Sequence, residues 1–312
     1  MTTKSKEGKK QAGLSEKFKS RYLPLYMMLI PIVLYYAIFV FKPMAGLVIA
    51  FQDYNVFKGI SGSEWVGFKH FIEFFKTPTV GRLFKNTLML NIWNMLFTFP
   101  APIIFALLLN EVRNTGLKKS IQTLTYMPHF ISAVVAAGIV LNMIAPGYGI
   151  ITKLFETITG KTFFFATMPE AFRPSYIGLN LWKELGFSSI VYISAIAGVD
   201  TQLYEAAALD GAGKFKRIIN VTIPGIMPTI VTLFIMKVGT LLNSSVETIL
   251  LLQQPATYEV SDVIGTYVYR AGLQDGSYSF STAVSLFNSL IALVFVASAN
   301  KLSKKVTEVG LW

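Results

Sequence analysis

Six long apolar spans constrain this chain more than any other feature of its sequence. Each has about 20 residues, the length that an α-helix needs to cross the hydrocarbon core of a bilayer. The spans run approximately over residues 23–41, 87–109, 121–144, 177–199, 227–252 and 281–300. The sequence therefore predicts an all-α polytopic membrane protein with six transmembrane helices.

The composition agrees with this fold class and excludes several kinds of chemistry. Of the 312 residues, 53% are hydrophobic and 14% are charged, which is typical of a polytopic membrane protein. The chain has no cysteine, so it forms no disulfide and has no thiolate nucleophile. Its two histidines do not support a histidine-based metal site. No carboxylate pair or Ser–His–Asp set stands out, and the sequence predicts no enzymatic site and no bound cofactor.

Lys and Arg are distributed unequally between the segments that connect the spans. Segments 1–22, 110–120, 200–226 and 301–312 together hold 16 of them, whereas the longer segments 52–86, 145–176 and 253–280 hold nine. This asymmetry places the basic segments in the cytoplasm and explains the net charge of +11 without nucleic acid. We therefore predict a cytoplasmic basic tail over 1–22, a membrane domain over 23–300 and a cytoplasmic tail over 301–312.

The spans and the external segments have distinct features. The first span exceeds the length of a signal-peptide core and can continue helically past Pro43 to Phe51. Segment 52–86 predicts a loop followed by an interfacial amphipathic helix, whose apolar side consists of Phe68, Phe71, Phe74 and Phe75. Residues 145–176 predict a small external cap, and residues 260–272 predict a short helix lying over the membrane.

The cytoplasmic segment 200–226 contains the sequence GAGKF, which is similar to a phosphate-binding loop. Such a loop needs a glycine where this chain has Ala208 and a Ser or Thr where it has Phe215. The segment therefore does not bind ATP by that device. Its residues instead predict a helix over Leu203 to Leu209, a turn at Asp210 to Gly213, and a basic amphipathic helix from Lys214 that ends at Pro224.

This helix–turn–helix segment is open to two interpretations. It is either a solvated connector, in which Asp210 is only a turn residue, or an element that docks into a partner. Its small residues permit close approach of another backbone, and Phe215, Ile218 and Ile219 place an apolar stripe where water would otherwise lie.

The segment also resembles the EAA motif of bacterial ABC importer permeases. The matching residues are Glu205-Ala206-Ala207, then Gly211 after three residues, then Val221-x-Ile223-Pro224 after nine more. Val221 and Ile223 are conservative departures from the residues usual in that family. The resemblance implies a type I importer fold and a coupling helix that inserts into a separate cytoplasmic ATPase. Glu205 would face that partner, Ala206, Ala207 and Gly211 would allow close packing, and Asp210 would order the bend.

The resemblance covers nearly the whole chain. Residues 38–57, 65–68, 258–286 and 310–312 look like the polysaccharide and complex-oligosaccharide permeases of that superfamily (the LplB-like group). It implies a carbohydrate substrate, a bacterial plasma membrane location, a second homologous permease, two ATPase subunits that use ATP and Mg²⁺, and an extracytoplasmic sugar-binding protein.

A sugar pathway needs polar side chains that face the bundle interior, because each unpaired hydroxyl costs several kcal/mol to dehydrate. The fifth span offers a polar stripe at helical spacing, and the fourth and sixth add further groups. The pathway candidates are Asn180, Trp182, Lys183, Glu184, Thr240, Asn243, Ser244, Glu247, Ser285, Asn288 and Ser289. Weaker candidates are Asn86, Asn91, Asn94 and His129.

Several alternatives remain open at this point. Ser and Asn in spans also serve helix packing, and Lys183, Glu184 and Lys237 could snorkel or pair with the second permease. Another polar solute, such as glycerol phosphate, is an alternative substrate, although no Arg cluster occurs in the spans. An ion-coupled secondary carrier using Glu184 and Glu247 is the alternative from a different class, and an intramembrane hydrolase lacks paired catalytic motifs.

Overall fold

The computed structural model describes residues 22–307 and residue 310. The chain divides into two compact units, Met1–Lys69 and His70–Trp312, each of which is described by itself. The predicted N-terminal tail lies outside the described residues except for Tyr22. The predicted C-terminal tail is described in part, since residues 308–309 and 311–312 also lie outside.

Unit 1 is a long apolar helix followed by a small hairpin. The helix runs over Tyr22–Phe51, so its predicted continuation past Pro43 is confirmed. Its last segments are the π-turn η1 (Ala37–Phe41), α2 (Lys42–Met44) and the 3₁₀ segment η2 (Ala45–Phe51). The wider π-turn precedes Pro43, whose missing N–H interrupts regular helical hydrogen bonding. The hairpin of β1 (Gln52–Asp53) and antiparallel β2 (Glu64–Trp65), with α3 (Gly59–Gly62) between them, was not predicted.

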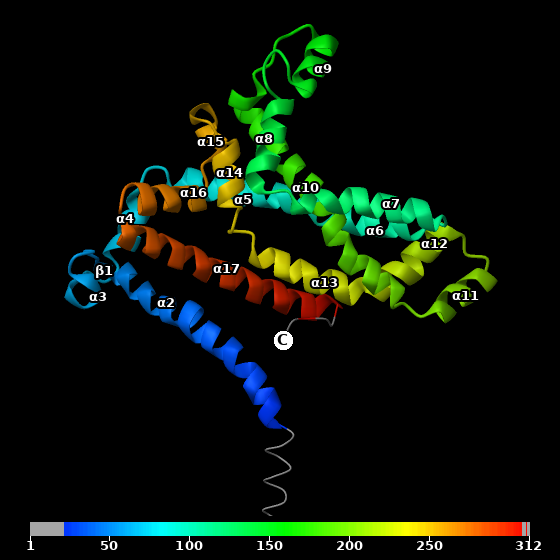
Figure 1. Cartoon of the computed structure of the whole chain (residues 1–312), viewed down its shortest axis with the longest axis horizontal. Coiled ribbons are helices and arrows are strands. Elements are labelled where there is room, and N and C mark those ends of the chain that lie inside the picture. The colour runs from blue at the N-terminus through cyan, green and yellow to red at the C-terminus, as the bar shows by residue number, and fades with distance from the viewer. Residues whose placement is uncertain (1–21, 308–309, 311–312) are drawn as a thin grey trace, which may run out of the picture. The chain divides into compact units, whose positions relative to one another are not determined.

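Unit 2 is almost entirely helical and holds the remaining elements (Figure 1). In chain order these are α4 (Lys69–Lys76), α5 (Val80–Thr98), α6 (Pro100–Asn110), α7 (Thr115–Tyr126), η3 (Met127–Phe130), α8 (Ala133–Met143), α9 (Ile150–Thr159), η4 (Phe165–Thr167), α10 (Pro169–Ala197), α11 (Thr201–Leu209), α12 (Lys214–Arg217), η5 (Ile218–Thr222), α13 (Ile223–Gly239), α14 (Val246–Leu252), η6 (Pro255–Thr257), α15 (Tyr258–Ser261), α16 (Ile264–Tyr269), η7 (Arg270–Gln274) and α17 (Tyr278–Thr307).

Across both units, four described helical stretches are long and apolar enough to cross a membrane. They are Tyr22–Phe51, Val80–Asn110, Lys214–Gly239 and Tyr278–Lys305. A fifth would be the pair Thr115–Phe130 and Ala133–Met143, which is bent by 103° and so is not the straight span predicted over 121–144. Helix α10 covers the predicted fourth span and has 29 residues, but it is not among these stretches, because Lys183 and Glu184 lower its hydropathy. The count of six membrane helices stays a prediction.

The predicted fifth span is wrong as a single helix. Helix α13 ends at Gly239, residues 240–245 form an irregular segment, and α14 begins after Ser245. The Ser245 hydroxyl lies 3.5 Å from the backbone N–H of Thr248 and caps the new helix. Ser, Asn and Thr compete with helical hydrogen bonds and favour caps and turns, which accounts for the break in this stretch.

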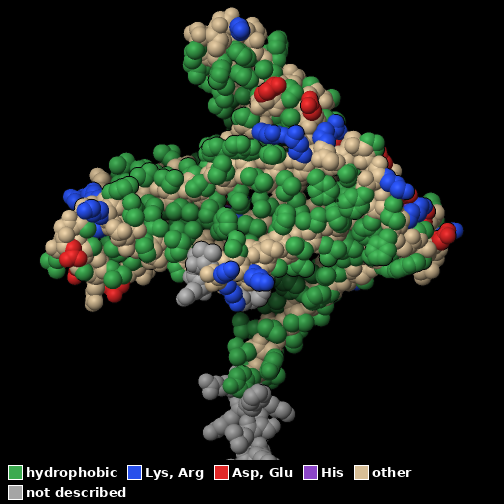
Figure 2. Space-filling model, turned by 180° about the vertical axis from the view of Figure 1, so that it is seen from behind, with side chains coloured by type: hydrophobic (Ala, Val, Ile, Leu, Met, Phe, Trp, Pro, Cys, Tyr) green, Lys and Arg blue, Asp and Glu red, His purple; other side chains and the backbone are tan. Residues whose placement is uncertain are grey.

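Helix α10 lies at the centre of unit 2, where it packs against α5, α6 and α7 (Figure 1). The largest buried cluster joins α10 to α5, α8 and α14. Its members are Leu90, Ala136, Ala137, Phe172, Tyr176, Leu179, Ile249, Leu252 and Val263. Figure 2 shows that one face is broadly hydrophobic, with charged side chains at its ends and edges, among them the end that carries α11 and α12. An apolar exterior of this kind suits a lipid environment.

Two predictions for the external segments need correction. Phe68, Phe71, Phe74 and Phe75 do not all lie on one helix, because α4 begins at Lys69. Phe74 and Phe75 both contact Phe287, with Phe74 buried and Phe75 exposed. Residues 260–272 are not one helix either, since the chain turns between α15 and α16.

Buried polar groups of α5 fix that turn in place. The Asn86 amide donates hydrogen bonds to the carbonyls of Glu259 (2.8 Å) and Asp262 (3.0 Å). The Thr87 hydroxyl accepts a bond from Ile264 N–H at 2.9 Å. Satisfying these backbone groups internally makes a broken helix tolerable in an apolar setting.

Candidate functional site

Unit 2 has two candidate functional features. One is the α11–α12 element (residues 200–226), and the other is a cavity between α5, α10 and the end of α13.

The α11–α12 element folds as the sequence predicted at its turn. Asp200 caps α11, its carboxylate accepting a hydrogen bond from Gln202 N–H at 2.9 Å. At the other end, Ala212 N–H donates to the Ala207 carbonyl at 2.9 Å and Gly211 N–H donates to the Ala208 carbonyl at 3.1 Å. This pair of bonds is the Schellman motif, and it places Gly211 in the left-handed region with φ of +72°.

The exposed surface of this element contains large apolar side chains. Leu209 is 90% exposed and Phe215 is 74% exposed, on either side of the turn. The small and acidic residues of the motif are on the same surface. Glu205, Ala206, Asp210, Gly211 and Pro224 are exposed, and Ala207 is half-buried. An apolar surface next to charged groups is typical of a contact with another protein.

The second helix of the element does not end at Pro224, which corrects that prediction. The π-turn η5 precedes α13, and Lys214–Gly239 is one continuous helix. A wider turn before Pro224 accommodates the residue that lacks an N–H. The sequence did not reveal two further contacts. Within the element, the Tyr204 hydroxyl donates to the Thr222 hydroxyl at 3.0 Å. The Lys214 ammonium lies 3.4 Å from the carboxylate of Glu111, outside the element.

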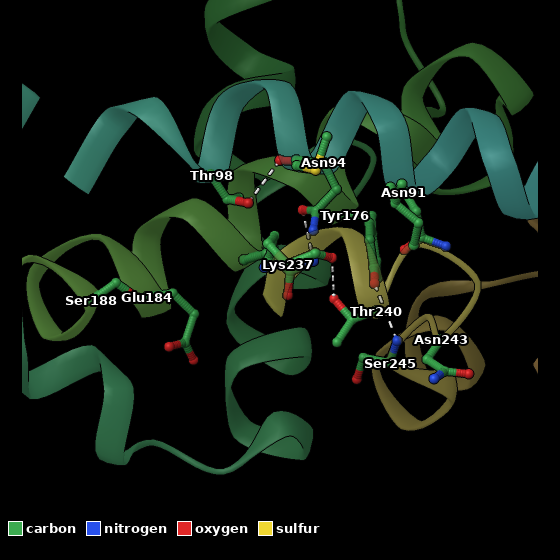
Figure 3. Close-up of a pocket in the computed structure, with 13 residues that line it drawn as sticks. Asn91, Asn94, Thr98, Tyr176, Glu184, Ser188, Lys237, Thr240, Asn243 and Ser245 are labelled. Atoms are coloured by element: carbon green, nitrogen blue, oxygen red, sulfur yellow. Dashed lines mark hydrogen bonds between the residues drawn. The ribbon is translucent and has the colours of Figure 1, made fainter. Parts of the chain in front are cut away.

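The cavity has a volume of about 260 Å³ and is lined mainly by amides and hydroxyls (Figure 3). Its lining comes from α5, α10, the end of α13 and the irregular segment that follows. The residues are Asn91, Asn94, Met95, Thr98, Tyr176, Asn180, Glu184, Ser188, Lys237, Thr240, Leu241, Asn243 and Ser245. We call this site the polar cavity.

Only some of the predicted pathway residues line the polar cavity. Asn180, Glu184, Thr240 and Asn243 do so. The other seven do not line it. Trp182 lines a separate, largely apolar cavity between α8, α9 and α10. The candidates absent from the polar lining are Lys183, Ser244, Glu247, Ser285, Asn288 and Ser289. The continuous stripe predicted from Thr240 to Glu247 does not exist, because the helix is broken between these residues.

Asn288 nevertheless stabilises one wall of the cavity. Its amide donates to the Leu242 carbonyl and to Asn243 Oδ1, each at 3.2 Å, and so holds the irregular segment against α17. On the opposite side, the Asn91 amide donates to the Ser244 hydroxyl at 2.7 Å. These bonds fix the broken segment as a defined wall.

Spacing in the sequence could have identified the residues that were missed. On α10, Tyr176, Asn180, Glu184 and Ser188 recur every four positions, and such residues share one helical face. Asn91, Asn94 and Thr98 follow the same rule on α5, and Asn180 donates to Asn94 Oδ1 at 3.3 Å between the two helices. Of the weaker candidates of the second span, Asn91 and Asn94 therefore belong to the site, whereas Asn86 does not line the cavity.

His129 enters the site through Glu184. Its Nδ1 atom lies 3.2 Å from Oε1 and 3.1 Å from Oε2 of that carboxylate. The imidazole stacks on Phe187, with ring centroids 3.8 Å apart. The described residues, 22–307 and 310, contain no cluster of three His, Asp or Glu side chains that could hold a metal ion.

Comparisons with known proteins identify the class of the chain. Residues 80–308 match the family described as "Binding-protein-dependent transport system inner membrane component". The chain belongs to this family, and it is a multi-pass membrane permease rather than an enzyme.

Individual relatives are similar over nearly the full length. The chain is 44% identical to the polygalacturonan/rhamnogalacturonan transport system permease protein YteP of Bacillus subtilis (strain 168), over 98% of this chain and 95% of that protein. It is 43% identical to Protein LplB of the same organism, over 92% and 91%. Among solved structures, it is 43% identical to a chain of a bacterial alginate ABC transporter in complex with an alginate pentasaccharide-bound periplasmic protein. The TM-score is 0.86, and the match covers 95% of this chain and 99% of the other.

Proposed function

We propose that this chain is a permease subunit of an ATP-driven importer of oligo- or polysaccharides, coupled to a separate ATPase through the α11–α12 element. One observation supports the proposed coupling between this element and the polar cavity. The continuous helix Lys214–Gly239 begins at the exposed element and ends in the wall of the polar cavity. Its 26 residues span about 39 Å at a rise of about 1.5 Å per residue. A displacement of the element is thereby transmitted to the site that receives the solute.

The polar cavity suits a sugar. Amide and hydroxyl groups both donate and accept hydrogen bonds, so they replace the water that sugar hydroxyls lose on entering the membrane. The two Bacillus subtilis relatives and the alginate transporter support a saccharide as the solute. A cavity of about 260 Å³ is slightly smaller than the roughly 300–1,000 Å³ of ordinary ligand pockets, which favours contact with a small part of a saccharide chain at a time.

The exposed side chains of the element suit insertion into a protein cleft. Leu209 and Phe215 would be buried by the partner, and Glu205 on α11 would make a polar contact at the same surface. The ATPase, and not this chain, would bind ATP and Mg²⁺. Its closure would move α11, and the Tyr204–Thr222 hydrogen bond would carry that movement into the helix that leads to the cavity.

The remaining partners follow from the same proposal. A second homologous permease would complete the pathway, two ATPase subunits would bind at the cytoplasmic side, and an extracytoplasmic sugar-binding protein would deliver the solute. The chain would reside in a bacterial plasma membrane with both termini in the cytoplasm, as the distribution of Lys and Arg indicates.

A test of the proposed contact uses the absence of cysteine from the chain. Leu209→Cys is made in the complex with the second permease, the ATPase and the binding protein, and is treated with a bifunctional maleimide. Leu154→Cys on α9 is the matched control, since Leu154 is also exposed but lies in the predicted external cap. We expect a cross-link to the ATPase from position 209 and not from position 154. Absence of that cross-link at position 209, in a complex that retains its ATPase, would refute the docking surface.

The function itself is tested by ATP hydrolysis in the same complex. Saccharide-loaded binding protein should stimulate hydrolysis, and Glu205→Ala should reduce that stimulation. Hydrolysis that is indifferent both to saccharide and to this substitution would leave α11 as a mere connector.

A further inference from the structure

Lys237 is the one cationic side chain in the lining of the polar cavity. It lies in the last turn of α13, two residues before the helix ends at Gly239. Figure 3 shows it between the α10 residues Glu184 and Ser188 on one side and Asn243 and Ser245 on the other. Its position is therefore central to the site, not peripheral to it.

An ammonium group is unfavourable in this setting unless it faces water or an anion. Charged side chains within membrane segments are costly, and they mark sites of function more often than sites of packing. Among residues 22–307 and 310, none of the recorded ion pairs includes Lys237. The C-terminal end of α13 favours a positive charge, because the last carbonyls of a helix carry partial negative charge.

The carboxylate in the same lining has a different partner. Both oxygens of Glu184 lie within 3.2 Å of His129 Nδ1, so this carboxylate is held at the α10 side of the cavity. The other polar groups of the lining are neutral amides and hydroxyls, of Asn91, Asn94 and Thr240 among others. The cavity thus presents hydrogen-bonding groups, the Lys237 ammonium and one carboxylate, that of Glu184, which attracts the ammonium but is too far from it for a direct ion pair.

That combination matches the chemistry of an acidic sugar. A uronic acid residue carries hydroxyls around its ring and one carboxylate, and a lysine ammonium binds a carboxylate as a compact point charge. A neutral sugar would leave the ammonium without a direct anionic contact, since the nearby Glu184 carboxylate is held by His129. The solutes of two relatives fit this chemistry, since polygalacturonan is a polymer of a uronic acid and alginate is an acidic polysaccharide.

We propose that Lys237 binds the carboxylate of an acidic saccharide in transit, and that the substrates of this chain are uronate-containing oligosaccharides. This inference rests on the proposed saccharide import. It adds a specificity-determining residue, and it predicts discrimination between charged and neutral forms of the same sugar chain.

The test compares trigalacturonate with its fully methyl-esterified form, in which each carboxylate is replaced by an uncharged methyl ester. Uptake of each is measured in proteoliposomes that contain the whole complex and ATP, for wild type, Lys237→Met and Lys237→Arg. Lys301→Met is the matched control, since it removes an exposed lysine near the end of α17. Variant uptake is divided by wild-type uptake for each probe, so that any preference of the binding protein cancels.

We expect Lys237→Met to reduce uptake of trigalacturonate at least tenfold and to change uptake of the methyl ester by less than twofold. Lys237→Arg should retain most uptake of both, and Lys301→Met should match wild type. Equal loss of both probes in Lys237→Met would overturn the inference, because Lys237 would then serve assembly or pairing with the second permease. Unchanged uptake of both would also overturn it. Wild type that takes up neither probe, in an assembled complex that hydrolyses ATP, would instead overturn the proposed saccharide import and the inference with it.

Discussion

Substitution of Gly211 is the most specific test of the α11–α12 element, because it changes only the backbone conformations that the turn can adopt. Its φ is +72°, in the left-handed region that L side chains rarely adopt. A Cβ built on Gly211 would have no atom within 4 Å, so a substitution causes no collision. Any effect of Gly211→Ala therefore reports the backbone conformation of the turn.

The magnitude follows from the cost of the left-handed conformation. For a residue with a Cβ this cost is about 1–2 kcal/mol, and it is smaller for Asn, whose side chain tolerates that region. An energy of this size shifts an equilibrium by about fivefold to thirtyfold. If the turn must hold this geometry to dock, Gly211→Ala should weaken ATPase binding by about that factor, whereas Gly211→Asn should stay closer to wild type.

The assay is titration of purified ATPase onto the reconstituted permease pair, with saccharide-stimulated ATP hydrolysis as the signal. Gly213→Ala is the matched control, since Gly213 also has open space around a Cβ but has an ordinary φ of −64°. It should bind the ATPase like wild type. Equal behaviour of Gly211→Ala and Gly213→Ala would show that the left-handed turn is irrelevant to docking, and would refute this reasoning.

Two further substitutions test the packing that supports the site, each by the thermal stability of the purified complex. Gly186→Ala should destabilise by about 1–3 kcal/mol through overpacking, because the new Cβ would collide with the backbone carbonyl of Thr125, whereas Gly178→Ala on the same helix meets nothing within 4 Å and should not destabilise. Arg270→Met should cost about 3 kcal/mol, since it leaves the buried carboxylate of Asp262 without the guanidinium that lies 2.9 Å away. The double variant with Asp262→Asn should recover part of that loss, and equal stability of the single and double variants would count against the pairing.

The sequence predicts the α11–α12 element well, because its signals are local. Small residues, a turn at Asp210 to Gly213 and a basic amphipathic stretch each act within a few positions, and the structure places the turn at those residues. The contact between Tyr204 and Thr222 was not predictable in the same way. It depends on how two helices pack, and sequence spacing does not determine that arrangement.

The same distinction explains the errors in the membrane spans. Hydropathy is averaged over a window of residues, so a hydropathy-based prediction treats α13 and α14 as one span. In the structure, Ser245 caps α14 as a separate helix. The capping residues near Ser245 could have indicated that break. For the 103° bend between α7–η3 and α8, the sequence offers only Pro128 and the cap residue Ser132 as indications. Pro224 caused the opposite error: the sequence predicted a helix end there, but the π-turn η5 lets the helix continue.

The substrate candidates show where sequence reasoning loses precision. The candidates were chosen by residue type, but helix rotation decides which of them face the cavity. Asn180 and Glu184 do, while their neighbours Trp182 and Lys183 are outside the polar lining. Lys237 was considered only as a side chain that snorkels or pairs with the second permease, because its place beside the break after α13 depends on a fold that hydropathy did not predict.

ATP-driven uptake of a labelled saccharide tests the central claim most directly. Proteoliposomes would contain this chain, its partner permease and the ATPase, with binding protein added outside and ATP enclosed. The account predicts accumulation that requires ATP, binding protein and an intact α11, and that persists when ionophores remove proton and sodium gradients. Accumulation that follows an ion gradient and needs neither ATP nor the ATPase would contradict it, and would identify the chain as an ion-coupled carrier.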